Sequence, residues 1–242
     1  MRIIRYLVNR GASVDPLPNF FWDDKMVLGE PNQPTPLITT IKSGSIEAAR
    51  ILISLGANLS YANPIKAEVY FPLLSASEEC RPDFVKLFVD AGADINEQGW
   101  GCWNALTCAV NQGNEPMVRY LVNLGADVNH VIHDDGRDGA LGYNTTASKV
   151  AETLKMAKLL VSLGADPKLT FPSGNALFDA VAKNNLELVK FFVEAGTPLN
   201  EVIDSRVVTD FAGLTALDAA ISRNYPAIAA YLKSKGAKSA KK

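Results

Sequence analysis

A glycine followed by a small residue ends a hydrophobic run at seven places in this chain: Gly11, Gly56, Gly92, Gly125, Gly164, Gly196 and Gly236. In five cases a leucine stands nineteen residues before the glycine, namely Leu37, Leu73, Leu106, Leu177 and Leu217. In a sixth case the leucine is Leu141, 23 residues before Gly164. A constant segment with variable joints is typical of a repeat array, in which each repeat buries its apolar face against its neighbours. Any function is then expected on the surface of the stack.

The segment from Leu177 to Gly196 has the pattern of two short helices joined by a tight polar turn. In the second helix apolar residues recur every three or four positions, and Lys190 and Glu194 lie four apart on the solvent side. Gly196 is predicted to end this helix, because a left-handed cap is sterically cheap without a side chain. Residues that tolerate positive φ recur at the turn between the helices: Gly44, Gly113 and the pair Asn184-Asn185.

Thr35-Pro36-Leu37, the run Thr215–Ala220 and the closing runs Gly92–Asn96 and Gly125–Asn129 are the segments by which this chain resembles the ankyrin-repeat family. The resemblance covers nearly the whole chain. It implies an all-α solenoid of stacked helix-turn-helix repeats with finger-like loops. The histidine that follows the Pro-Leu pair in the family is absent, and its positions hold Ile38, Leu74, Thr107, Gly142, Phe178 and Asp218. The hydrogen bonds that this histidine supplies between fingers are therefore not expected here.

The repeats divide the chain into a single ankyrin-repeat domain over residues 1–242. Its predicted parts are a partial N-terminal repeat (1–15), an insertion (16–34), a tail (239–242) and six repeats at 35–63, 71–98, 104–131, 139–170, 175–202 and 215–238. The first repeat lacks its inner helix, which leaves Ile3, Ile4 and Leu7 in need of a cover, since burying one such side chain contributes about 1.5–3 kcal/mol. Either the insertion caps this helix or the helix mediates self-association of an otherwise monomeric protein.

Composition argues against several classes of function. Lys+Arg 24 against Asp+Glu 26 gives a formal charge of −2, without the basic excess that nucleic-acid binding requires. Cys80, Cys102 and Cys108 are too few for a disulfide framework and are interpreted as reduced, small buried hydrophobes. Neither a secretory signal nor an apolar stretch of about eighteen residues is present in the sequence. We expect a soluble cytoplasmic protein that binds neither nucleic acid nor membrane.

Enzyme signatures are missing from the sequence. It contains no Gly-rich phosphate loop, no His-Glu-x-x-His helix and no strand-turn-helix setting for a nucleophile, so neither a catalytic site nor a cofactor is predicted. One loop could hold a divalent metal, because it combines imidazole and carboxylate groups: His130, His133, Asp134, Asp135 and Asp138. Asp135-Gly136 is also ordinary turn chemistry for a finger, and we favour that interpretation.

Side chains at the finger tips are the first set of candidate contacts. Six and three residues before the marker leucines, the sequence places Tyr70, Trp100, Trp103, Asp135, Phe171 and Phe211. Exposed aromatic residues are enriched in protein interfaces because they bury a large area at a small cost in entropy. The alternative is that the aromatic rings fold back onto adjacent fingers.

The ends of the inner helices supply the second set. By the resemblance, the family's other contact positions include Glu78, Glu79, Asn111, Gln112, Lys183 and Arg223. Their charge changes sign along the array, which favours a protein partner over a polyanion, although a merely solvated face is the alternative for any one of them.

Together these features predict a non-catalytic protein-interaction module that binds a protein partner through its concave groove and finger loops. Two other functions remain open at this point. The array could neutralise a toxin or enzyme by plugging its active site, or it could be the targeting fragment of a longer enzyme.

Overall fold

The computed structural model describes residues 2–15, 35–62, 69–99, 103–132, 145–204 and 210–240. The chain divides into two compact units. The N-terminal unit comprises Met1–Ala109 and Asn123–Ala126, and the C-terminal unit comprises Val110–Val122 and Asp127–Lys242. The division passes through two helices, α6 (Ala105–Asn111) and α7 (Glu115–Asn123).

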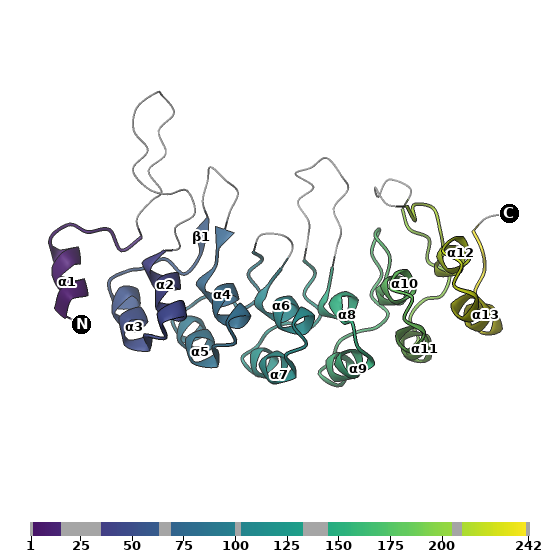
Figure 1. Cartoon of the computed structure of the whole chain (residues 1–242), viewed down its shortest axis with the longest axis horizontal. Coiled ribbons are helices and arrows are strands. Elements are labelled where there is room, and N and C mark those ends of the chain that lie inside the picture. The colour runs from purple at the N-terminus through teal and green to yellow at the C-terminus, as the bar shows by residue number, and fades with distance from the viewer. Residues whose placement is uncertain are drawn as a thin grey trace, which may run out of the picture. The chain divides into compact units, whose positions relative to one another are not determined.

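Helix pairs build the N-terminal unit (Figure 1). Its elements are α1 (Arg2–Asn9), α2 (Pro36–Ser43), α3 (Ile46–Ser54), β1 (Tyr61–Ala62), β2 (Val69–Tyr70), α4 (Pro72–Glu78) and α5 (Pro82–Asp90). Within a repeat α2 packs on α3 and α4 on α5, whereas between repeats α2 packs on α4 and α3 on α5. The strands form a short antiparallel hairpin at a finger, with Tyr61 opposite Tyr70. The expected helix-turn-helix architecture is confirmed, with this hairpin as an addition.

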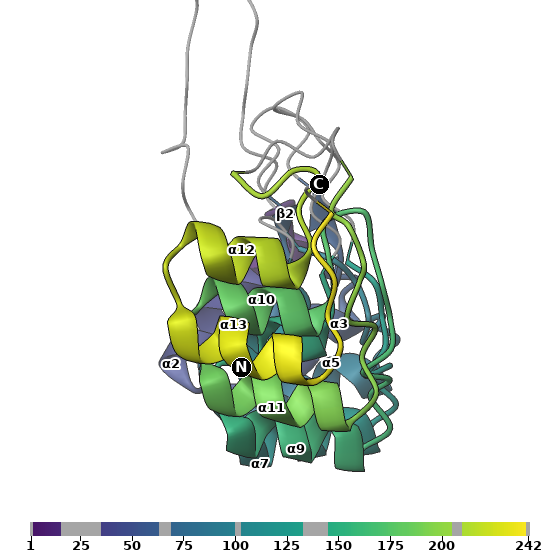
Figure 2. The same cartoon turned by 90° about the vertical axis from the view of Figure 1, so that its right-hand side faces the viewer.

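The same arrangement recurs in the C-terminal unit (Figure 2). Its further helices are α8 (Ala147–Val150), α9 (Leu154–Ser162), α10 (Ala176–Ala182), α11 (Leu186–Glu194), α12 (Ala216–Ser222) and α13 (Pro226–Ser234). The inner helix α10 packs on both α8 and α12, and the outer helix α11 packs on both α9 and α13. Each helix pair therefore buries its apolar side chains against the pairs before and after it.

Glycines end the outer helices as predicted. All seven stop glycines have positive φ, from 86° at Gly236 to 103° at Gly125. At the other end, side chains cap some of the inner helices: Asn175 Oδ1 accepts a hydrogen bond from Phe178 N at 3.1 Å, and Thr215 forms a capping box with Asp218. In these repeats the local sequence fixes where the inner helix begins.

The turn between the two helices of a repeat contains residues with positive φ, as predicted, and in one repeat that residue is a cysteine. Gly44, Gly113 and Asn184 have φ of 72°, 68° and 54°. Asn224 and Cys80 occupy the same turn in their repeats, with φ of 57° and 52°. Cysteine has neither the freedom of glycine nor the local hydrogen bonding of asparagine, so this conformation costs about 1–2 kcal/mol at Cys80. The interpretation of Cys80 as a buried hydrophobe is wrong, because this turn places it on the surface.

Replacing Cys80 by glycine should stabilise the protein. Removing the strained Cβ gains about 1–2 kcal/mol, of which the greater freedom of glycine in the unfolded chain returns about 0.4–1 kcal/mol. The midpoint of thermal unfolding should therefore rise by about 2 °C. Asn224→Gly is the matched control and should change the midpoint less, since asparagine tolerates the left-handed region. A lower midpoint for C80G would show that the Cys80 side chain contributes contacts worth more than the strain.

The marker leucines form the core, as their spacing predicts. Leu37, Leu73, Leu106, Leu177 and Leu217 are all buried. The sixth marker, Leu141, lies outside the described residues.

The register predicted for the repeat at 139–170 is wrong. Its inner helix α8 begins at Ala147, six residues after Leu141, and has only four residues. Buried Thr146 is its N-cap, so Thr146-Ala147-Ser148 corresponds to Thr35-Pro36-Leu37. The leucine-to-glycine spacing failed here because a serine, Ser148, stands at the marker position. Consequently Lys149, and not Gly142, occupies the position that histidine holds in the family.

Asparagine side chains connect successive loops in the C-terminal unit. Asn129 Oδ1 accepts a hydrogen bond from Asp166 N at 2.8 Å, and its Nδ2 donates to Gly164 O at 3.0 Å. Asn200 Oδ1 accepts from Lys238 N at 2.7 Å, and Asn175 Nδ2 donates to Pro198 O at 3.0 Å. These bonds satisfy backbone groups of the loops that would otherwise lack a partner within a helix or strand.

Asp218, at the family's histidine position in the last repeat, fastens the C-terminal segment. Its carboxylate accepts hydrogen bonds from Ser239 Oγ and from Ala240 N, as well as from the N-cap residue Thr215. Burial raises the pKa of Asp218, but these hydrogen bonds outweigh burial and hold the pKa below its usual value. The last repeat therefore keeps its cap through a charged residue where the family uses an imidazole.

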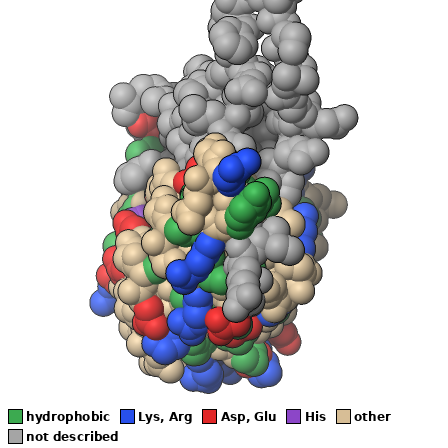
Figure 3. Space-filling view, turned by 90° about the vertical axis from the view of Figure 1, so that its left-hand side faces the viewer, with side chains coloured by type: hydrophobic (Ala, Val, Ile, Leu, Met, Phe, Trp, Pro, Cys, Tyr) green, Lys and Arg blue, Asp and Glu red, His purple; other side chains and the backbone are tan. Residues whose placement is uncertain are grey.

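Helix α1 presents apolar side chains at the surface. Tyr6 and Leu7 are 61% and 50% exposed, and the Arg10 guanidinium lies 5.9 Å from the Tyr6 ring centroid. Basic and apolar side chains mingle on the corresponding face of the unit (Figure 3). The insertion at 16–34, predicted as a possible cap, lies outside the described residues, and self-association through α1 stays a prediction.

Candidate functional site

The structure describes four of the predicted contact residues in the N-terminal unit. Glu78 ends α4 and Glu79 follows it, both exposed. Partial burial, followed in importance by the neighbouring charge of Glu79, raises the pKa of Glu78. The backbone of Tyr70 lies in β2, and the half-buried Trp103 accepts a hydrogen bond from Gly99 N at its carbonyl oxygen, at 2.7 Å. None of these four residues lines the pocket described below.

Several other predicted residues cannot be placed in a site. Trp100, Asp135 and the side chain of Tyr70 lie outside the described residues, whereas Asn111 and Gln112 are exposed at the end of α6. Of the alternative metal cluster, the structure describes His130 alone. Across the ranges that the structure describes, no group of three His, Cys, Asp or Glu side chains could hold a metal ion.

Unlike the exposed Cys80, Cys108 is a buried thiol. Burial, and to a smaller extent the nearby Glu78 and Cys80, raises the pKa of Cys108 to about 12, so this thiol carries almost no thiolate at neutral pH. The interpretation of Cys108 as a small buried hydrophobe is confirmed. Cys102 lies outside the described residues.

Two predicted contact residues of the C-terminal unit, Phe211 and Arg223, lie side by side. The Arg223 guanidinium carbon is 4.8 Å from the Phe211 ring centroid, and Arg223 Nη2 lies 3.0 Å from Asp210 Oδ2. On its other side Phe211 meets Phe178 of α10 edge to face, with ring centroids 5.3 Å apart and an interplanar angle of 75°. The loop before α12 is thus fixed to both inner helices by ring contacts.

The buried Lys149 and the partly exposed Asp179 form an ion pair close to this cluster. Lys149 Nζ lies 3.6 Å from Asp179 Oδ2 and donates hydrogen bonds to Ser173 Oγ at 3.1 Å and Gly174 O at 3.3 Å. The same ammonium lies 5.5 Å from the ring centroid of Phe171, a third predicted finger residue. Its side chain is only 7% exposed. Lys149 therefore joins α8 to the next finger and to α10, as the family's histidine would.

Burial sets the protonation behaviour of this pair. It lowers the pKa of Lys149, and the charge of Asp179 offsets part of that effect. It raises the pKa of Asp179, against the opposing charges of Lys149 and Lys183. Burying either charge alone would therefore be costly, and each group stabilises the charged form of the other. Lys183, a predicted contact residue, is exposed at the end of α10 and acts on Asp179 through its charge.

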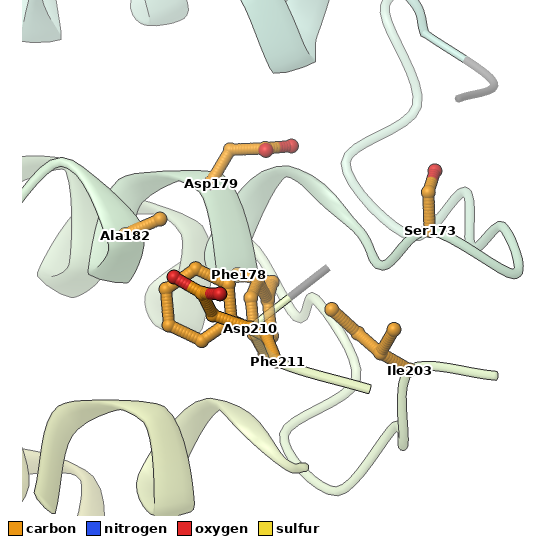
Figure 4. A pocket seen from close by; sticks show the side chains of 7 residues that line it. All are labelled: Ser173, Phe178, Asp179, Ala182, Ile203, Asp210 and Phe211. Atoms are coloured by element: carbon orange, nitrogen blue, oxygen red, sulfur yellow. The ribbon is translucent and has the colours of Figure 1, made fainter. Parts of the chain in front are cut away.

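A pocket of about 390 Å³ opens between α10 and the loop that precedes α12 (Figure 4). It is lined by Ser173, Phe178, Asp179, Ala182, Ile203, Asp210 and Phe211. The rings of Phe178 and Phe211 lie together on one side, with Asp210 beside them, and Asp179 projects from α10 across from them (Figure 4). The pocket therefore combines an apolar wall with two carboxylates.

Sequence reasoning identified Phe211 in this lining but missed Asp179, Asp210 and the supporting Lys149. A signal existed for Asp179, since it is a carboxylate within the otherwise apolar run of α10. Lys149 was hidden because the repeat that contains it was placed out of register.

Comparisons with known proteins agree with this architecture. A family model described as ankyrin repeats (3 copies) matches residues 2–99, 74–170 and 144–242. Ankyrin repeat and SOCS box protein 6 of Pongo abelii is 30% identical over 148 residues, which cover 60% of this chain and 34% of that protein. Human protein phosphatase 1 regulatory subunit 27 is 34% identical over 98 residues, 40% of this chain and 60% of that one.

Among solved structures, the ankyrin repeat domain of Bcl-3 superposes with a TM-score of 0.63 at 25% identity, covering 85% of this chain and 87% of that one. The chain spans about a third of the length of the first of the relatives above. In the described parts of the structure, every helix is too short or too polar to cross a lipid bilayer.

Proposed function

We propose that this chain, which belongs to the ankyrin-repeat family, is a protein-binding module that holds its partner at the pocket between α10 and the loop before α12. Ankyrin repeats are protein-interaction modules, so the family sets the general role. What we add to this general role is the surface that binds the partner. We place binding in the C-terminal unit and assign no chemical step to the chain.

The pairing of Arg223 with Phe211 at the edge of this pocket is the observation that carries the proposal. Arginine and aromatic side chains dominate binding hot spots, because they bury a large area next to a pocket that a partner can fill. Arg223 pairs with Asp210 at the surface and Phe211 packs on Phe178, and these contacts favour one arrangement of the two side chains before a partner arrives. Ordering in advance reduces the entropy lost on binding.

The names of the relatives support a role in binding. One is a regulatory subunit of a protein phosphatase, and another carries a SOCS box beside its ankyrin repeats. The two alternatives, neutralisation of a toxin or enzyme and targeting of a longer enzyme, would use the same surface. The identity of the captured partner separates them, since an enzyme that loses activity on binding would favour neutralisation.

Affinity capture with matched variants tests the proposal. The wild-type chain, the double variant F211A/R223A and the control I221A are used as bait in extract from the native cell. Ile221 is 51% exposed on α12 and lies outside the pocket lining, so its loss should leave binding intact. A partner recovered by the wild type and by I221A should fall by about 30-fold with the double variant, the effect of losing one hot spot.

Two further measurements make this result decisive. The thermal midpoint of each bait shows whether F211A/R223A still folds, because Phe211 also packs on Phe178. The single variant R223A, which leaves the ring pair in place, should retain the midpoint and still weaken capture. Equal recovery of partners by all the baits would move the binding surface away from this pocket.

A further inference from the structure

We infer that the pocket between α10 and the loop before α12 receives an arginine side chain from the partner protein. This inference rests on the proposed function and names the chemistry of the contact.

The described residues of the lining carry charge of one sign. Their charged side chains, Asp179 and Asp210, are both carboxylates. The cations that pair with them, Lys149 and Arg223, lie outside the lining. A cationic group that enters the pocket therefore meets the two carboxylates directly and shares them with Lys149 and Arg223.

Asp179 is only partly covered by its ion pair with Lys149. Its Oδ2 atom is the one near Lys149, is shielded from solvent and accepts no hydrogen bond from the described residues. The side chain as a whole is 32% exposed, so the exposed surface belongs to its other atoms. Lys149 thus pairs with the shielded oxygen, and the exposed part of the Asp179 side chain lines the pocket, where an incoming donor can contact it.

The apolar part of the lining suits the stem of a long basic side chain. Phe178, Ile203 and Ala182 provide surface for methylene groups, and Asp179 and Asp210 provide carboxylates for the charged head. Long basic side chains bind in this way, with the stem against apolar surface and the head on polar groups. Arginine fits better than lysine, because its planar guanidinium can stack on a ring and contact two carboxylates at once.

The chain itself contains an example of the contact. Arg223 stacks on Phe211 and pairs with Asp210, which is the combination of ring and carboxylate that we assign to the incoming side chain. An arginine from the partner would extend this arrangement towards Asp179, with the Phe178 and Phe211 rings beside it.

Peptide pools test the inference with the full chain. Immobilised seven-residue peptides are random except at the fourth position, which is arginine, lysine, citrulline or glutamate in four separate pools. Citrulline has nearly the shape of arginine without its charge. The wild type should bind the arginine pool at least tenfold more tightly than the citrulline or glutamate pool, and more tightly than the lysine pool.

Variants assign the preference to the pocket. D179N should abolish the tenfold difference between the arginine and citrulline pools, and D210N should reduce it. Asp166 is exposed in the same unit and lies outside the lining, so D166N should keep the full preference. D210N provides a second reading should D179N fail to fold.

The inference is overturned if the wild type binds the arginine and citrulline pools equally, if it prefers glutamate, or if D179N and D210N both keep the arginine preference. Its failure is distinct from that of the proposed function. Loss of partner capture by F211A/R223A with unchanged capture by D179N would retain the binding surface and remove the arginine. If the chain selects the arginine pool but no captured partner depends on Phe211 and Arg223, the arginine contact is retained and the proposed binding function is rejected.

Discussion

Replacing Lys149 by methionine should destabilise the C-terminal unit by about 3 kcal/mol. Methionine fills a similar volume, so the loss comes from the charge and its bonds. The variant leaves Asp179 Oδ2 shielded from solvent without its cation, and it leaves Ser173 Oγ and Gly174 O without the donor they share. An isolated buried charge is far more costly than a missing pair, which is why removing one partner has a large effect.

A double-mutant cycle separates the pair from its surroundings. K149M/D179N should regain most of the lost free energy of unfolding, to within about 1 kcal/mol of the wild type, because neither charge is then left alone. Lys155→Met is the matched control. Its ammonium also pairs with a carboxylate, Glu115 at 2.7 Å, but its side chain is 79% exposed, and such a surface pair contributes about 0–1 kcal/mol. A K149M variant no less stable than K155M would show that the buried pair does not support the fold.

The stability lost in K149M should depend on pH. Burial already raises the pKa of Asp179 in the folded wild type, against the charges of Lys149 and Lys183. Removing Lys149 raises it further, so the folded variant takes up a proton at a higher pH than the unfolded chain does. The folded variant therefore gains stability relative to the unfolded chain as pH falls. The difference between K149M and the wild type, measured by urea unfolding, should shrink from pH 7 towards pH 5.

Lys149 also shows where prediction from the sequence stopped. The spacing rule finds a repeat by its leucine and its glycine, and it placed Leu141 at the marker because no leucine stands at Ser148. The information was local: Thr146-Ala147-Ser148 has a threonine at the N-cap position, as Thr35 and Thr215 do in their repeats, but it lacks the leucine. A buried lysine is rare enough that its position on an inner helix would have indicated a specific partner.

The parts of the fold that were predicted follow local rules. Gly196 ends its helix and Asn184 forms its turn because of backbone geometry, which one residue determines. The pocket depends on tertiary placement, since Asp179, Ile203 and Phe211 belong to three segments of the chain. The repeat spacing predicts that Phe211 lies on a finger. Its contacts with Phe178 and Arg223 depend on how separate segments of the chain pack together. Local signals therefore determine the repeat, and the site arises from differences between repeats.

The second large effect is expected in the core beneath the pocket. Leu177→Ala should cost about 3–5 kcal/mol of unfolding free energy, because it removes a fully buried leucine and leaves a cavity that neighbouring helices cannot close. The helix that carries it, α10, packs on α8, α11 and α12 at once. In a repeat array, stability depends on contacts between neighbouring repeats, so a defect at α10 weakens the repeats on both sides of it.

Urea unfolding followed by circular dichroism measures this loss, with Ile221→Ala as the control. Ile221 is also an aliphatic residue on an inner helix, but it is 51% exposed, so its truncation should change the free energy by less than about 1 kcal/mol. The ratio of the two effects tests the repeat register directly, since the leucine rule assigns Leu177 and not Ile221 to the core. Equal losses for the two variants would mean that α10 does not bury the face that the spacing of leucine and glycine predicts.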